Sequence, residues 1–334
     1  MSGIRFYSSD GKEVKRNTSV DHLPKVEGYN FEEKFDFDAF IEAYKTTGFQ
    51  ATHFGKAVDI FKKMIEKKAF IFLSFTSNMI SSGLREIITF LVKHKIVHVI
   101  VTSAGGVEED VIKSLNPFVL GRFDVKGKVL LDAGICRTGN LYVPLDRYAY
   151  FEKFMRKFLD KIYDEQKKTG KVMSYHELLR RLGAEINSED SYLYWAAKND
   201  IPVFCPGLID GAFGDMLHFY KTANPDFLLE QISDFSKIVD VALQHETTGA
   251  VILGGGIAKH FTLNANIFKD GLDYAIYINT AQEYDGCDSG ARIEEAITWL
   301  KIKPDAPAVK IHADATLIFP LLVAALFARK DKQD

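Results

Sequence analysis

The stretch that decides the fold is AFIFLSFTSNMISSGLREIITFLVKHK, residues 69–95. Its first seven residues form a nearly continuous apolar run, which is typical of a strand buried on both faces of a parallel sheet. Ser77 and Asn78 then predict a turn, and the apolar spacing from Met79 onward predicts a helix. A buried strand, a turn and a helix in this order are the repeating unit of α/β proteins.

The same unit occurs three more times along the chain. The copies are VHVIVTSAGG with VEEDVIKSL (97–115), PVFCPGLIDG with AFGDMLHFY (202–220), and AVILGGG with IAKHFTLNANIF (250–268). Two further strands are expected in YAIYINT (274–280) and AVKIHA (308–313), and ATLIFPLLVAALFARK (315–330) is expected to close the chain as a helix bent at Pro320. The sequence therefore predicts an α/β fold with a doubly wound, mostly parallel sheet and helices on both faces.

The rest of the chain divides into an arm, two leading helices and an insertion. Residues 1–34 are polar and mixed in sign, which predicts an amino-terminal arm, and residues 35–334 are expected to form a single domain. Apolar residues recur every three or four positions in 36–49 and 51–68, which predicts two amphipathic helices. Residues from about 116 to 200 are predicted to be a helical insertion between the second and third copies of the unit.

Composition excludes several classes of protein. The 334 residues are 47% hydrophobic and 26% charged, as in globular proteins, and the net charge of -3 offers no basic surface for nucleic acid or an anionic membrane. The amino terminus lacks an apolar signal segment and no apolar run is long enough to span a bilayer, so a cytoplasmic protein is expected. Cys136, Cys205 and Cys287 lie far apart without metal-ligand spacing, so we expect neither a disulfide nor a bound metal.

Three turns at expected strand ends are candidates for a phosphate-binding site. They are Ser77-Asn78, Ala104-Gly105-Gly106 and Gly254-Gly255-Gly256, after the first, second and fourth strands. Ligands of open α/β sheets bind at the carboxyl ends of the strands, where glycine lets the backbone approach a phosphate. A single glycine turn is more often structural, and none here has the spacing G-x-G-x-x-G, but three at successive strand ends favour a dinucleotide. Asp210, after the third strand, either accepts a hydrogen bond from a ribose hydroxyl or caps a helix.

Acidic residues gather near the end of the chain, in NTAQEYDGCDSGARIEEAITWLK (279–301). A solvated acidic surface is the usual explanation of such a run. Against it, the turn YDGCDSG follows an apolar strand, and carboxylates beside an aromatic ring suit a linear polycation such as a polyamine. The residues concerned are Glu283, Asp285, Asp288, Glu294, Glu295 and Trp299, to which Glu108, Glu109 and Asp215 from other strand ends could be added.

Lys301 and His260 are the candidate catalytic residues, although each alone is more often an ordinary surface residue. Lys301 follows Trp299 at the end of an expected helix with an apolar side, where partial desolvation would favour a neutral amine able to form an imine. His260 directly follows the glycine triplet, so it would lie near the nicotinamide end of a dinucleotide and could move a proton. Lys259 is the other lysine near a glycine turn and therefore the alternative nucleophile.

Seven blocks of the sequence together resemble the deoxyhypusine synthase family in order and spacing. The blocks are SNMISSGLRE (77–86), SAGGVEED (103–110), DGAFGD (210–215), GGGIAKH (254–260), INTAQEYDGCDSGAR (278–292), TWLK (298–301) and ADATLIFPLLVA (313–324). Long motifs in register are far more specific than one glycine turn. The resemblance implies a Rossmann-like NAD-binding fold and a homotetramer with active sites at the subunit interfaces.

The resemblance also implies roles for individual residues. The positions that match NAD contacts are Ser77, Asn78, Met79, Ile80, Ser81, Ser103, Ala104, Gly105, Glu109, Asp210, Gly255, Thr280, Asp314 and Ala315. The positions that match the surroundings of spermidine are Glu108, Glu109, Asp215, His260, Gly286, Cys287, Asp288, Glu295 and Trp299, and Lys301 matches the lysine that forms the enzyme imine.

The implied reaction moves the butylamine arm of spermidine onto a protein. NAD takes a hydride from spermidine, Lys301 captures the arm with loss of 1,3-diaminopropane, and the arm passes to a lysine of the hypusine-containing translation factor precursor. Two alternatives stay open. One is a homospermidine synthase, which resembles the same family and uses putrescine as acceptor. The other is a weakly active regulatory partner, suggested by Leu300 where the family pattern has glycine; Cys287, Phe261 and Ala212 are lesser departures.

Overall fold

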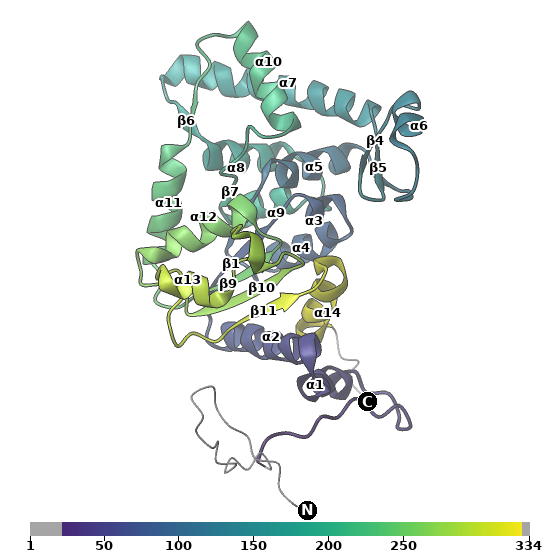
Figure 1. The fold of residues 1–334 in the computed structure, drawn as a ribbon. Coiled ribbons are helices and arrows are strands. Elements are labelled where there is room, and N and C mark those ends of the chain that lie inside the picture. Colours follow the sequence, from purple (N-terminus) through teal and green to yellow (C-terminus); the bar gives the residue numbers. More distant parts are fainter. Residues whose placement is uncertain (1–21, 329–334) are drawn as a thin grey trace, which may run out of the picture.

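The computed structural model describes residues 22–328, whose centre is a six-stranded parallel sheet (Figure 1). The strand order is β11-β10-β9-β1-β2-β7, and every neighbouring pair is parallel. The strands are β1 (Phe70–Phe75), β2 (Val99–Thr102), β7 (Val203–Phe204), β9 (Thr248–Leu253), β10 (Tyr274–Asn279) and β11 (Ala308–His312). The chain builds β1, β2 and β7 toward one side, then returns to β9 beside β1 and builds outward to the other side. The doubly wound fold is thereby confirmed, with the reversal of direction between β1 and β9.

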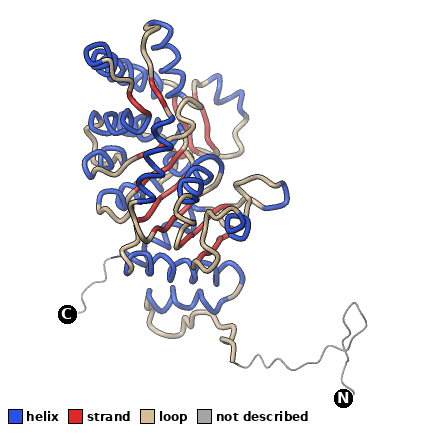
Figure 2. The backbone as a smooth tube through the Cα atoms, turned by 90° about the vertical axis from the view of Figure 1, so that its left-hand side faces the viewer, coloured by secondary structure: helices blue, strands red, loops and turns tan. Residues whose placement is uncertain are grey.

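Both faces of the sheet are buried, which explains the continuous apolar runs in the sequence. Successive side chains of a strand point to opposite faces. In β1, Ile71 and Leu73 belong to one hydrophobic core, while Phe72 between them belongs to the second core on the other face. Helices lie on both sides of the strands, which are red in Figure 2.

Helices from both ends of the chain cover the first face. They are α1 (Phe37–Thr47), α2 (Phe49–Glu66), α3 (Asn78–Ser81), α4 (Leu84–Lys93), α5 (Ala104–Leu115) and α14 (Ala315–Phe327). The second face is covered by α11 (Ile232–Leu243), α12 (Gly256–Ile267) and α13 (Ile293–Thr298). No helix of the described part of the chain combines the length and apolar character needed to cross a membrane.

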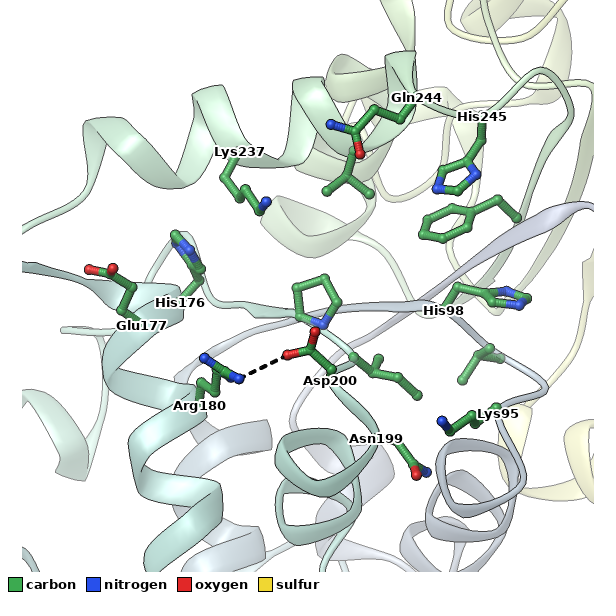
Figure 3. Close-up of a pocket in the computed structure, with 15 residues that line it drawn as sticks. Lys95, His98, His176, Glu177, Arg180, Asn199, Asp200, Lys237, Gln244 and His245 are labelled. Atoms are coloured by element: carbon green, nitrogen blue, oxygen red, sulfur yellow. Dashed lines mark ion pairs between the residues drawn. The ribbon is translucent and has the colours of Figure 1, made fainter.

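The insertion before β7 is not wholly helical, so that prediction was wrong in part. Its helices are α6 (Gly127–Asp132), α7 (Asp146–Thr169), α8 (Tyr175–Glu185) and α9 (Tyr192–Asn199). It also holds an antiparallel sheet of β3 (Val119–Leu120), β5 (Leu141–Pro144) and β4 (Ile135–Thr138). Strands of two to four residues are too short to show a period of two. The insertion joins the central sheet beside a cavity (Figure 3).

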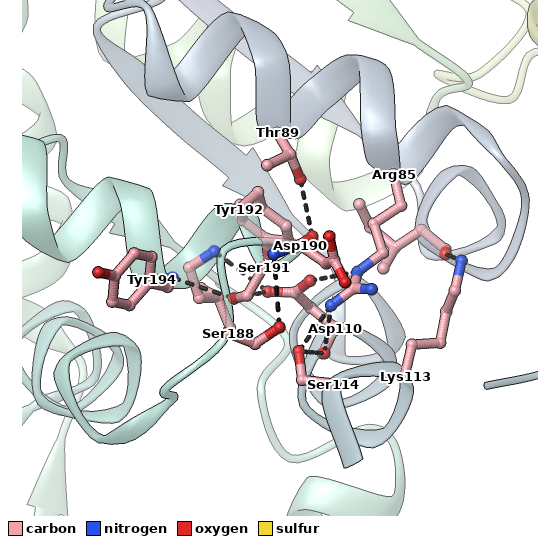
Figure 4. Close-up of polar contacts among 12 residues, drawn as sticks. Arg85, Thr89, Asp110, Lys113, Ser114, Ser188, Asp190, Ser191, Tyr192 and Tyr194 are labelled. Atoms are coloured by element: carbon pink, nitrogen blue, oxygen red, sulfur yellow. Dashed lines mark hydrogen bonds and ion pairs between the residues drawn. The ribbon is translucent and has the colours of Figure 1, made fainter. Parts of the chain in front are cut away.

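A buried polar network fastens the insertion to the sheet helices (Figure 4). Arg85 of α4 donates from Nε to Asp110 of α5 over 2.7 Å, and both side chains are almost fully buried. The second carboxylate oxygen of Asp110 accepts from the Ser191 hydroxyl over 2.6 Å and from the Leu193 amide over 3.1 Å. Asp110 therefore joins α4, α5 and the start of α9, and every charge in the network has a partner.

Other boundaries also differ from the expectations. The helix expected over 79–95 is broken into α3 and α4, because the Ser82 hydroxyl accepts from the Leu84 amide and starts a new helix. The expected Ala104-Gly105-Gly106 turn is the first turn of α5. Pro320 lies inside α14, the helix that was expected to contain it. The remaining elements are α10 (Ala212–Ala223), the 3-10 helix η1 (Glu283–Asp285) and the short pair β6 (Met173–Ser174) and β8 (Leu229–Glu230). Of the expected arm, residues 22–34 contain no helix or strand, and residues 1–21 lie outside the described residues.

Candidate functional site

The site is built around the switch point of the sheet, where the turns after β1 and β9 touch. Gly254 has a φ of 86°, and a Cβ atom on it would lie 2.6 Å from Thr76 Oγ1. Only glycine combines this conformation with so close an approach. Gly255 is equally confined, because a Cβ atom there would lie 2.5 Å from Ser289 of the acidic turn. The glycine triplet therefore brings the end of β1 and the acidic turn to one edge of the sheet.

The turn after β1 also meets the start of α5. The Ser77 amide donates to Ser103 Oγ over 3.1 Å, and a Cβ atom on Gly105 would lie 2.5 Å from Ser77 Cβ. The first turn of α5 thus packs directly against the Ser77 side chain of the β1 turn. The start of a helix at the carboxyl end of a parallel strand is a suitable position for a phosphate group.

The buried Glu108 and the partly buried Glu109 lie beside this turn. Glu109 of α5 accepts a hydrogen bond from the Ser81 hydroxyl. Burial raises the pKa of Glu109 to about 7, against the Ser81 hydrogen bond and with help from the neighbouring Glu108. Burial also raises the pKa of Glu108, and the carboxylates of Asp215 and Asp210 add to this effect. The positive charge of Lys113 opposes the rise at Glu109, and a bound cation would oppose it further.

Glu108 also settles which residue caps α10. The Phe213 amide donates to Glu108 Oε2 over 2.7 Å, so Glu108 takes the role of an amino-terminal cap from another helix. Asp210 lies in the turn before α10, makes no cap and is exposed. Of the two interpretations of Asp210, the helix cap is therefore excluded. Asp215 lies in the first turn of α10 and is also exposed.

Lys301 and His260, 41 positions apart in sequence, are brought into contact. Lys301 Nζ lies 3.1 Å from His260 Nε2, and His260 Nδ1 lies 3.2 Å from the Asn264 amide. Only 8% of Lys301 is exposed, whereas Trp299, whose ring centre is 5.9 Å from Lys301 Nζ, is 63% exposed. The amine therefore lies in a recess beside an exposed indole.

The backbone before Lys301 explains why glycine suits position 300. The Leu300 amide donates to Ile297 O and the Lys301 amide to Ala296 O, each over 3.0 Å, which is the hydrogen-bond pattern of a Schellman motif. This motif places Leu300 in the left-handed conformation, with a φ of 55°. A leucine is strained there by about 1–2 kcal/mol. The strain lies immediately before the candidate nucleophile.

The acidic turn is held by Lys259, a residue noted in the sequence only as an alternative nucleophile. Lys259 is fully buried, donates to the carbonyl groups of Asp288 and Ala291, and lies 4.9 Å from the centre of the Tyr277 ring. Burial lowers its pKa, against the nearby carboxylates of Asp288 and Glu295. These contacts show that Lys259 positions the acidic turn. The amino-acid sequence gives no signal for this role, because the partners are backbone oxygens 29 and 32 residues away.

One oxygen of Asp288 stands out. Its Oδ2 atom is buried and has no hydrogen-bond partner among the described residues. Glu295 is exposed on α13, and Cys287 and Gly286 lie in the exposed turn, where Gly286 has a φ of 71°. An unpartnered buried carboxylate oxygen is costly unless a ligand supplies a donor.

The remaining candidates lie at the ends of the last two strands. Thr280 follows β10 and is exposed, and Asp314 follows β11, where it accepts from the Thr316 amide over 2.7 Å and caps α14. Ala315 is the first residue of that helix. Besides these residues and those after β7, the candidates form a first group at the ends of β1 and β2 and a second group around Lys301. Within residues 22–328, no side-chain hydrogen bond or ion pair joins the first group to the second.

This arrangement defines the class of the protein. A parallel sheet with its switch point at β1 and β9, glycine-bearing helix starts at that point and a recessed lysine beside it characterise a Rossmann-like α/β protein. A profile of the deoxyhypusine synthase family matches residues 39–326. The chain belongs to the deoxyhypusine synthase family, whose members are transferases.

Individual relatives agree with this assignment. The deoxyhypusine synthase of Musa acuminata is 46% identical over 99% of this chain and 93% of its own length, and that of Arabidopsis thaliana is 44% identical over 100% and 98%. Among solved structures, one of a protein assigned as deoxyhypusine synthase in Entamoeba histolytica superposes with a TM-score of 0.67. The two sequences are 30% identical, and the match covers 91% of this chain and 97% of that protein.

Proposed function

We propose that this chain transfers the 4-aminobutyl group of spermidine to a lysine of the hypusine-containing translation factor precursor and so forms deoxyhypusine. Membership of the family supports the reaction. The observation that carries the proposal for this chain is the contact between Lys301 Nζ and His260 Nε2. The Asn264 side-chain nitrogen can only donate, so His260 Nδ1 accepts and a neutral His260 carries its proton on Nε2. Nε2 then donates to Lys301 Nζ, which can accept only as a neutral amine. The neutral Lys301 amine then attacks the oxidised carbon of the substrate and releases 1,3-diaminopropane.

NAD is the proposed cofactor, and the chain offers it a suitable surface. When bound, it accepts a hydride from the carbon beside the secondary amine of spermidine and later returns it to the product. The start of α5, where Gly105 packs against Ser77, lies at the carboxyl end of β2, which is the position where the pyrophosphate of NAD is proposed to bind. The other proposed NAD contacts are the positions that match NAD contacts in the family: Asn78, Met79, Ile80, Ser81, Ser103, Ala104, Glu109, Gly255, Thr280, Asp314 and Ala315. Asp210, which caps no helix, is available for a ribose hydroxyl.

Spermidine is proposed to bind among the carboxylates of Asp288, Glu108 and Glu109. Asp288 Oδ2 is buried without a partner, and an ammonium group of spermidine would supply one. Trp299 presents an exposed ring beside Lys301, which suits contact with the methylene chain. Glu109 and Glu108 form a second acidic position, where burial and the neighbouring carboxylates raise both pKa values.

A second copy of the chain is proposed to complete each site in a homotetramer. The two groups of candidate residues share no side-chain hydrogen bond or ion pair within residues 22–328, so ligands that touch both groups could bridge two subunits. Large apolar side chains are also exposed on the elements that carry the Lys301 group, namely Ile257, Tyr284, Trp299, Leu300 and Leu317. Covering such side chains is a normal function of a subunit interface. A cytoplasmic location is proposed because the precursor is a translation factor.

A product assay tests the function. Purified protein is incubated with NAD, spermidine labelled in the butyl group, and either the precursor protein or putrescine. The expected result is label in deoxyhypusine on the precursor, formed by this chain alone. Label only in homospermidine would assign the alternative acceptor. Absence of any product with this chain alone, and its appearance when a paralogue is added, would assign a regulatory role.

A further inference from the structure

A second site of a different character lies at the opposite edge of the central sheet. A cavity of about 560 Å³ lies between the sheet and the helical insertion (Figure 3). Its walls are the start of β1, the loop before β2, α8, the end of α9 and α11. Phe70 lines the cavity and Ser77 lies at the other end of the same strand, about 20 Å away at 3.3 Å per residue. The cavity is therefore separate from the glycine turns and from Lys301.

The rim of the cavity carries uncompensated positive charge. Of its five charged rim residues, Arg180 pairs with Asp200 over 3.1 Å, and Glu177 pairs outside the cavity with Lys171 over 2.7 Å. Both carboxylates are thus already engaged. Lys95 and Lys237, on the β2 side and on α11, have no ion-pair or hydrogen-bond partner among residues 22–328. Two ammonium groups are left for a ligand.

His176 gives the wall a fixed polar group. Its Nδ1 atom lies 2.8 Å from Oδ1 of Asp234, whose side chain is 1% exposed. Because the carboxylate accepts, Nδ1 carries the proton, and Nε2 is the nitrogen left for a ligand. The other oxygen, Asp234 Oδ2, is buried and has no partner in the described chain. The Asp234 carboxylate fixes the orientation of the His176 ring through its Oδ1 contact.

A second histidine adds another donor. His98 Nδ1 accepts from the Ile71 amide over 3.0 Å, so its neutral ring must carry the proton on Nε2. Its ring stacks on Phe70, which also stacks on His245 with ring centres 3.7 Å apart. The stack fixes both imidazoles in the wall. Burial lowers the pKa of His98 and of His245, so near neutral pH they act as uncharged polar groups.

We infer that this cavity binds a small polyanion with phosphoryl groups. The Lys95 ammonium and the His98 donor come from the loop before β2, and the Lys237 ammonium comes from α11 on another wall of the concave site. Donors on two walls can reach different acceptor oxygens of a phosphate, and two ammonium groups match a ligand with at least two negative charges. The volume lies within the range of small-molecule pockets. The ligand differs in charge from spermidine and binds at the opposite sheet edge, so the site does not depend on the proposed reaction.

Binding of inorganic pyrophosphate to the full chain tests the inference. Titration calorimetry at constant ionic strength is expected to show saturable binding, which NAD does not displace. The double variant Lys95→Gln, Lys237→Gln, which changes only exposed side chains, is expected to bind at least about tenfold more weakly. The matched control is Lys157→Gln, an exposed lysine on α7 outside the cavity, which should bind like the parent protein.

Two results would overturn the inference. One is the absence of saturable pyrophosphate binding to the parent protein. The other is binding that the double variant retains in full and that NAD displaces, because the anion would then occupy the glycine turns. That second result would leave the proposed function intact. Thermal unfolding of the double variant close to that of the parent would exclude misfolding as the cause of weaker binding.

Discussion

Replacing Glu109 by glutamine should stabilise the unliganded protein, and only at neutral to alkaline pH. Burial raises the pKa of Glu109 from an ordinary 4.5 to about 7. The folded protein therefore holds a proton on this carboxyl group that the unfolded chain has lost. Below pH 4.5 both states are protonated and the group has no effect. Between pH 4.5 and about 7 the unfolded chain ionises while the folded protein keeps the proton, so the folded protein loses stability as the pH rises. Above about pH 7 both states are ionised and the loss stays constant.

The size of the effect follows from the difference between the two pKa values. Each pH unit of difference corresponds to 1.36 kcal/mol, which sets an upper value of about 3 kcal/mol above pH 7. Glutamine cannot ionise and keeps a similar shape, so Glu109→Gln removes this term. The same change should weaken polyamine binding, because the carboxylate is proposed to face a cation.

The assay is urea unfolding of parent and variant without ligand at pH 5 and at pH 8. The stability difference should be small at pH 5 and reach up to about 3 kcal/mol in favour of the variant at pH 8. All other titrating groups are shared, so they cancel in the difference. Glu66→Gln, at an exposed position at the end of α2, is the control and should show no such difference. A Glu109→Gln effect that is equal at both pH values would refute the reasoning.

Three further substitutions test other parts of the structure. Gly105→Asp should abolish NAD binding in calorimetry, because its Cβ would lie 2.5 Å from Ser77 Cβ and its carboxylate would repel a phosphate; unchanged affinity in a folded variant would mean the turn is misplaced. Leu300→Gly should raise the free energy of unfolding by up to about 1 kcal/mol, since glycine accepts a φ of 55°, and a lower value would rule out strain there. Asp110→Ala should cost about 3–5 kcal/mol by leaving Arg85 buried without its partner; a cost below 1 kcal/mol would show that the network is not needed.

The fold was largely predictable from the sequence, because long apolar strands and periodic helices carry strong local signals. The run at 69–75 became β1, and the glycine triplet at 254–256 lies where the sheet reverses. The strands of the insertion were missed since they are only two to four residues long. The break before α4 was also missed, although Ser82 and Gly83 are a polar and a flexible residue at its position.

The residues of the candidate site could be chosen from the sequence, but their contacts in space could not be predicted from it. Lys301 and His260 were chosen separately, and their 3.1 Å contact depends on tertiary packing that no local pattern encodes. Glu108 was expected near a ligand, yet it also caps α10 across the sheet edge. The role of Lys259 depends on backbone oxygens of a distant turn. Such long-range polar contacts are decided by the folded chain and leave no periodic signal.

The most direct test of the central claim is covalent trapping of the substrate on Lys301. Borohydride is added to the protein with NAD and spermidine, and the protein is digested and analysed by mass spectrometry. The account predicts a butylamine adduct on the peptide that contains Trp299 and Lys301, and none on the Lys301→Ala variant. An adduct on Lys259 instead, or no adduct while spermidine is still cleaved, would contradict the assignment of Lys301 as the covalent carrier.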